Sequence, residues 1–118
     1  MKLINSLSDL YDAIAESADN EWVYVNLATW SSKPEDCPFY IIPEAEIDEM
    51  SDDEIYESEA GPYLPIQLRH LNLWPWMEIG TLQGVIQNLN MGNKTGFNAD
   101  LFVKGINYYR EHDDFWDA

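Results

Sequence analysis

The feature that most constrains this chain is an acidic run between positions 44 and 59, which reads EAEIDEMSDDEIYESE. The run holds nine carboxylates and no lysine or arginine, and the nearest basic residues are Lys33 before it and Arg69 after it. Like charges held so close together destabilise a compact state through mutual repulsion. Any fold of this chain must therefore keep the run at the surface, where water or a partner can balance the charge.

Two features of the run predict that it is ordered. Apolar residues punctuate it at Ile47, Met50, Ile55 and Tyr56, so it can dock on a core. Ser51 followed by Glu54 fits a capping box, which predicts a short helix over residues 52–58. An ordered acidic surface suits a positively charged partner, whereas a solvated acidic loop serves only solubility.

Length and charge bound the possible partners. A chain of 118 residues predicts a single domain spanning 1–118, and its 46% hydrophobic content argues against intrinsic disorder. The formal charge of −16 repels nucleic acid and anionic membranes, so direct binding to either is not expected. Basic proteins, cationic ligands or metal ions remain as partners.

The single cysteine, Cys37, excludes an internal disulfide and fits a reducing compartment. Asp9 and Asp12 interrupt the region where a secretion signal would need an apolar stretch, and no segment has the length of a membrane span. We therefore expect a cytoplasmic protein that is monomeric when free.

Before the acidic run, the pattern predicts one helix and two strands. An apolar stripe that starts at Leu7 predicts a helix over 7–18, capped by Ser6 or Ser8. Residues 22–27 predict a strand with Val23, Val25 and Leu27 towards the core and Trp22, Tyr24 and Asn26 on the other face. A polar loop over 31–36 leads to a second strand over 38–42, antiparallel to the first.

After the run, the pattern is less regular. Residues 63–73 fit either a strand or a helix, and a helical or irregular segment is favoured. The segment 74–77 contains Pro75 and is expected to be an irregular apolar plug. Helices are predicted over 81–90, capped by Thr81, and over 98–111, capped by Asn98, with a loop at 91–96 between them. Gly84 inside the first of these helices indicates the close approach of a neighbour.

These elements predict an α+β fold, in which a small antiparallel sheet packs with about three main helices. The residues offer little for catalysis, because His70 and His112 are far apart in sequence and Cys37 has no histidine beside it. A calcium loop that starts at Asp48 would place Asp53 where an EF-hand needs glycine. We therefore expect no enzymatic activity, no cofactor and no dedicated metal site.

The five tryptophans and seven tyrosines exceed what a core of this size needs, and such residues are enriched at interface hot spots. Trp30 and Tyr56 are the candidates for exposed anchors. Trp74, Trp76 and Trp116 are expected in the core. The predicted partner-binding residues are Glu44, Glu46, Asp48, Glu49, Asp52, Asp53, Glu54, Tyr56, Glu57, Glu59 and Trp30.

In its size, in the acidic insert after a strand and in its YYREHDDF ending (108–115), the chain resembles the small acidic immunity proteins of bacterial contact-dependent growth inhibition and related polymorphic-toxin systems. The resemblance implies an inhibitor that binds and neutralises a basic toxin, in particular a nuclease. Two alternatives stay open. One is a DNA mimic of the anti-restriction or anti-CRISPR kind, and the other is an unspecialised acidic interaction domain.

Overall fold

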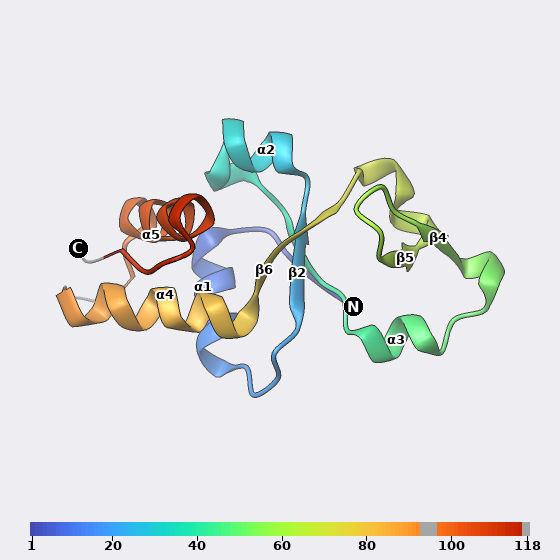
Figure 1. The fold of residues 1–118 in the computed structure, drawn as a ribbon, viewed down its shortest axis with the longest axis horizontal. Coiled ribbons are helices and arrows are strands. Elements are labelled where there is room, and N and C mark those ends of the chain that lie inside the picture. Colours follow the sequence, from blue (N-terminus) through green and yellow to red (C-terminus); the bar gives the residue numbers. More distant parts are fainter. Residues whose placement is uncertain (93–96, 117–118) are drawn as a thin grey trace.

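The computed structural model describes residues 1–92 and 97–116 and has an α+β fold, as predicted (Figure 1). Its central sheet contains four antiparallel strands in the order β1-β3-β2-β6, and β4 and β5 form a separate antiparallel pair. The strands are β1 (Lys2–Ile4), β2 (Trp22–Val25), β3 (Phe39–Ile41), β4 (Ile55–Glu57), β5 (Tyr63–Pro65) and β6 (Trp74–Glu78). The α-helices are α1 (Leu7–Glu16), α2 (Leu27–Ser32), α3 (Glu44–Asp48), α4 (Ile79–Gly92) and α5 (Ala99–His112). Three short 3-10 helices complete the elements, η1 (Pro34–Asp36), η2 (Asp52–Glu54) and η3 (Ile66–Leu71).

One face of the central sheet forms the main core. Val23, Val25 and Phe39 are fully buried there, against apolar side chains of α1, α4 and α5 such as Leu10 and Phe102. Because side chains alternate across a strand, the apolar residues at positions 23 and 25 share this face. The prediction that these two valines point to the core is therefore confirmed.

The opposite face of the sheet supports a smaller core. Tyr24 on β2 packs in a cluster with Ile42, Leu64, Leu68 and Leu73. Two of these residues, Leu64 and Leu68, belong to residues 44–71, which we call the acidic lobe. Figure 1 shows the acidic lobe across the sheet from α1, α4 and α5, at one end of a molecule measuring 47 × 30 × 24 Å.

Several local predictions are confirmed by capping contacts. The Ser6 hydroxyl accepts a hydrogen bond from the Asp9 backbone N–H at 3.1 Å, at the start of α1. The Asn98 side chain accepts from the Leu101 backbone N–H at 3.1 Å, at the start of α5. Each cap satisfies a backbone donor that has no partner inside the helix. The pairing of β2 with β3 is antiparallel, as expected from the connection between them.

The prediction of an irregular plug at 74–77 is wrong, because these residues form strand β6. Pro75 is compatible with this strand because β6 lies at the edge of the sheet, and the β2–β6 register shifts between Val23 and Tyr24. The start of the next helix is also wrong, since α4 begins at Ile79 directly after β6. Its capping oxygen comes from a distant residue: Asn20 Oδ1 accepts from the Gly80 backbone N–H at 2.8 Å.

The prediction for the acidic run is wrong in detail. Its first half forms the helix α3, whereas the expected helix over 52–58 is only the single turn η2. The chain then becomes strand β4, in which Ile55 and Tyr56 are β-branched and aromatic and pair with Pro65 and Leu64 of β5. Residues 63–73 combine the two expected alternatives, strand β5 followed by η3.

Two further elements, β1 and α2, were not predicted. Helix α2 takes in the last residue of the expected strand and the first two of the expected loop at 31–36, and at its start Asn26 Oδ1 accepts from the Thr29 backbone N–H at 3.0 Å. Leu27 consequently belongs to α2 and not to the preceding strand.

The predicted close approach at Gly84 is confirmed, since a Cβ at that position would lie 2.5 Å from the Phe115 ring. Most of the predicted loop at 91–96 lies outside the described residues.

Candidate functional site

The carboxylates of the acidic run lie on the surface of the acidic lobe. All of them are well exposed except that of Glu46, which is partly buried and forms an ion pair with the Met1 amino group. Among residues 1–92 and 97–116, no lysine or arginine forms an ion pair with another carboxylate of the run. We call these exposed carboxylates the acidic surface.

The predicted capping box organises the centre of this surface. The Glu54 carboxylate accepts from the Ser51 backbone N–H at 3.1 Å, and the Ser51 hydroxyl donates to Asp53 Oδ1 at 2.6 Å and to Glu54 Oε1 at 2.7 Å. The hydrogen bonds from Ser51 lower the pKa of both carboxyl groups, because they stabilise the ionised form. This turn therefore keeps its negative charge as the pH falls towards the ordinary range of carboxyl groups.

Trp30 is not an exposed anchor, which corrects the prediction. Its side chain is buried in the main core, where its ring centroid lies 4.7 Å from that of Trp76 and 6.1 Å from that of Phe39. Its indole Nε1–H donates to Asn107 Oδ1 at 3.0 Å. Helix α2 carries Trp30 inward, and residues 34–36 of the polar loop expected beside it form η1.

Tyr56 is only partly exposed. Its ring packs against the smaller core, and the Arg69 guanidinium lies 5.8 Å from the ring centroid. This arrangement is a cation–π contact within the protein itself. The structure therefore gives Tyr56 a role in holding η3 against β4, in addition to any contact with a partner.

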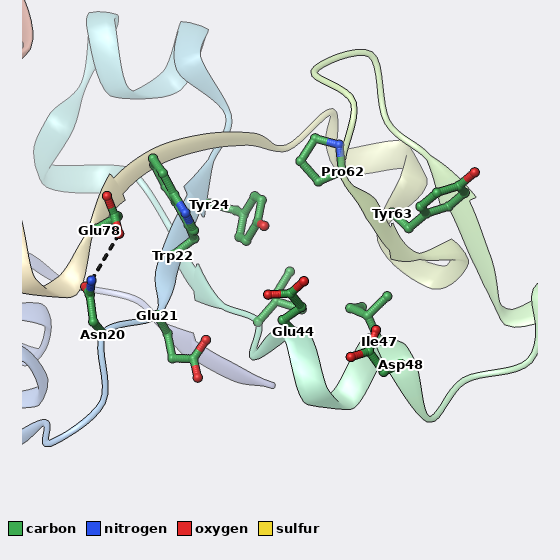
Figure 2. Close-up of a pocket in the computed structure, with 11 residues that line it drawn as sticks. Asn20, Glu21, Trp22, Tyr24, Glu44, Ile47, Asp48, Pro62, Tyr63 and Glu78 are labelled. Atoms are coloured by element: carbon green, nitrogen blue, oxygen red, sulfur yellow. Dashed lines mark hydrogen bonds between the residues drawn. The ribbon is translucent and has the colours of Figure 1, made fainter.

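The structure reveals a cleft that the sequence did not predict, with a volume of about 520 Å³, between the acidic lobe and β2 (Figure 2). Aromatic side chains from both sides line it. Trp22 is 42% exposed and Tyr63 is 51% exposed, whereas Tyr24 is only 8% exposed. The carboxylates that line it are Glu21, Glu44, Asp48 and Glu78, and the remaining lining residues are Asn20, Ile42, Ile47 and Pro62. We call it the acidic cleft.

Hydrogen bonds fix the wall of the cleft that β6 provides. Asn20 Nδ2 donates to Glu78 Oε2 at 3.0 Å, as Figure 2 shows, while its Oδ1 accepts from Gly80. The Ile79 backbone N–H donates to the Glu21 carbonyl at 2.9 Å. The same contacts that start α4 thus hold the Glu78 carboxylate at the rim of the cleft.

Helix α3 provides the opposite wall and joins the cleft to the acidic surface. Glu44 and Asp48, one turn apart on α3, belong to both. Ile47 from the same helix packs against the smaller core and so anchors α3 beside β2. A partner that lies on the acidic surface would therefore also reach the cleft.

Tyr24 stands out among the cleft residues. Its side chain is more than nine-tenths buried, yet its hydroxyl points into the cleft and bonds to no residue within 1–92 and 97–116 (Figure 2). Burial raises the pKa of Tyr24, and the negative charges of Glu44 and Glu21 raise it further. The hydroxyl therefore stays protonated and keeps a free acceptor position towards the cleft.

Carboxylates and tyrosines are the titratable groups of the cleft lining. Within the described part of the chain, its lining contains no histidine, cysteine, serine or lysine. No three histidine, cysteine, aspartate or glutamate side chains of the described residues lie where they could hold one metal ion. His70 is exposed on η3, and Cys37 is buried, where desolvation raises its thiol pKa to about 11.

Sequence reasoning identified the carboxylates of α3 but missed Trp22, Tyr24, Tyr63 and Glu78. One signal was present, because the alternation in 22–27 places Trp22 and Tyr24 on the face away from the main core. What the pattern could not reveal is that residues 44–48 and 62–63 fold over that face.

No protein-family model, curated protein or solved structure matches this chain. No helix in the described residues has the length and apolar character needed to cross a membrane.

Proposed function

We propose that this protein is a non-enzymatic inhibitor of the immunity type, which binds a basic toxin domain through the acidic surface. The observation that carries the proposal is the exposure, on an ordered lobe, of the carboxylates of the acidic surface, none of which forms an ion pair with a lysine or arginine in the described residues. A toxin that cleaves nucleic acid needs a positive surface to hold phosphates. An acidic protein can occupy that surface, and long-range attraction accelerates its capture.

The distribution of charge favours this proposal over mimicry of DNA. A mimic needs carboxylates spread along a surface at the spacing of phosphates. Here the acidic run gathers them on the lobe at one end of the molecule, while the rest of the chain builds a sheet and helices around an aromatic core (Figure 1). Such a surface suits one basic patch on a folded partner.

The test is a binding measurement with the C-terminal domain of the protein encoded immediately upstream of this chain's gene. We would reverse three exposed carboxylates that make no side-chain hydrogen bond within the described residues, as Glu49→Lys, Asp52→Lys and Glu57→Lys. We expect association to slow at least about tenfold at low salt, and wild-type association to slow as salt is raised. Unfolding should change little, because exposed like charges contribute little to stability.

A matched control carries the same total charge change elsewhere. Asp12→Lys, Glu16→Lys and Glu35→Lys alter exposed residues of α1 and η1, away from the acidic lobe. If attraction depends on the acidic surface, this control should retain most of the wild-type association rate. Equal slowing in both variants would mean that net charge alone attracts the partner, and absence of binding would reject the immunity role.

A further inference from the structure

We propose that the acidic cleft binds an arginine side chain presented by the partner. This inference rests on the proposed function, because the cleft shares Glu44 and Asp48 with the acidic surface. It adds a specific contact to what is otherwise a general electrostatic attraction. Three properties of the cleft support it: its charge, its aromatic walls and the Tyr24 hydroxyl.

The charge of the cleft selects a cation. Four carboxylates line it, and no lysine, arginine or histidine does so among the described residues. Protein walls of low dielectric constant concentrate the potential of such charges inside a cleft. A metal ion is disfavoured because no three of these ligands converge on one point in the described part of the chain. The carboxylates therefore suit an extended cation whose donors reach several acceptors.

The aromatic walls select arginine over lysine. Trp22 and Tyr63 both line the cleft and are 42% and 51% exposed, so a cation in the cleft can lie over a ring face. A guanidinium is planar and weakly hydrated, so it stacks on such a face while its N–H groups point outward in the ring plane. An ammonium is a compact, strongly hydrated charge and uses these walls less well.

The Tyr24 hydroxyl supplies the third property. It is a polar group on a side chain more than nine-tenths buried, directed into the cleft and without a hydrogen-bond partner in the described residues. The hydroxyl oxygen itself is open to the cleft, so its acceptor position is available to a donor that enters there. A guanidinium between Trp22 and Glu44 would donate to this oxygen and to the carboxylate, which satisfies both (Figure 2).

The occupant is a side chain of the partner because the cleft continues into the acidic surface. Its volume of about 520 Å³ exceeds that of one side chain and accommodates the tip of a loop that carries it. The structure therefore assigns the partner an arginine at the tip of a protruding segment, flanked by further basic residues that face α3.

The first experiment uses a probe that does not depend on the toxin. Acetyl-Gly-Arg-Gly-amide would be titrated into ¹⁵N-labelled protein, together with the lysine peptide and the citrulline peptide, which is a neutral isostere of the arginine peptide. We expect saturable shifts of the Trp22 indole N–H and of the α3 amides with the arginine peptide. The lysine peptide should bind at least about threefold more weakly, and the citrulline peptide should not bind at up to tenfold higher concentration.

The variant Trp22→Leu should weaken binding of the arginine peptide by about twofold to thirtyfold, the range expected for loss of a cation–π contact. Phe115→Leu is the matched control, because Phe115 is also exposed but lies outside the cleft lining. Thermal unfolding of both variants would establish that they fold. The arginine site would be overturned by equal affinities for the arginine and lysine peptides in the NMR titration, or by unchanged affinity of Trp22→Leu for the arginine peptide.

The second experiment separates this inference from the proposed function. With the toxin domain as partner, Trp22→Leu should raise the dissociation rate and leave the association rate nearly unchanged, because a short-range contact is lost. If the acidic-surface reversals slow association while Trp22→Leu leaves dissociation unchanged, the immunity role stands and the arginine site is wrong. If the toxin does not bind but the arginine peptide occupies the cleft, the site stands and the immunity role is wrong.

Discussion

Truncation of Leu64 tests whether the acidic lobe depends on its own small core. Leu64 lies on β5, is 0% exposed and packs with Tyr24, Ile42 and Leu68 away from the main core. Burying a leucine side chain contributes about 1.5–3 kcal/mol, and Leu→Ala changes in cores cost about 2–5 kcal/mol once the cavity is included. The partly buried Ile47 and Tyr56 beside it can relax into the space. We therefore expect Leu64→Ala to lower the free energy of unfolding by about 2–3 kcal/mol.

Urea denaturation followed by fluorescence and circular dichroism measures this loss, and amide hydrogen exchange locates it. Exchange should accelerate first at the amides of β4 and β5, because the lobe has fewer buried contacts than the main core. Ile66→Ala is the control: Ile66 is close in sequence but 46% exposed, so its truncation should cost less than about 0.5 kcal/mol. Equal destabilisation by the two variants would refute the assignment of a separate core to the lobe.

Two further predictions concern titrating groups. Ser51→Ala should raise the pKa of Asp53 and of Glu54, measured by NMR titration of the carboxyl carbons, because the hydrogen bonds that stabilise their ionised forms are lost. Both pKa values are lowered in the folded state. The wild type should therefore be more stable to unfolding than Ser51→Ala above the ordinary carboxyl pKa of about 4, and this difference should disappear as the pH falls through the folded-state pKa values. Cys37, whose pKa is raised by burial to about 11, should react with a thiol reagent at pH 8 roughly a hundredfold more slowly in native protein than in urea. Equal labelling rates in the two states would contradict the burial of this thiol.

Local patterns predicted the helices that carry their own start signals. Ser6 and Asn98 cap α1 and α5 from adjacent sequence, and each helix has a regular apolar stripe. The start of α4 was mispredicted because its cap comes from Asn20, which is far from Gly80 in sequence. A cap supplied by tertiary structure leaves no local sequence signal, and the local pattern indicates Thr81 instead.

The same distinction explains β6. Pro75 within a short aromatic segment argues against a strand when the chain is considered alone. At the edge of a sheet, where one side of the strand has no partner, that objection weakens. Edge position is a property of strand order, β1-β3-β2-β6, and this order places β6 beside β2 although the two are far apart in sequence. Sequence periodicity carries no information on that order.

The acidic cleft escaped prediction for a related reason. Glu44 and Asp48 were identified from charge alone, whereas Trp22 and Tyr24 were recognised only as the face of a strand opposite the core. Joining the two sets requires knowledge that α3 packs beside β2 on that face. The apolar residue Ile47 fixes this packing; in the sequence it indicates that the acidic run docks on a core, but not which surface receives it.

The position of the acidic lobe links its stability to its proposed role. The lobe contributes few buried residues, and repulsion among its carboxylates opposes its folding. In a complex with a basic partner, the same carboxylates would attract, and Tyr24 would gain a hydrogen-bond partner. A ligand that binds only the folded lobe stabilises it by an amount that grows with the logarithm of the ligand concentration relative to Kd. The same charge density that destabilises the free lobe would therefore accelerate its association with a basic partner. The small core need only hold α3 and β2 close enough for the cleft to exist before the partner binds.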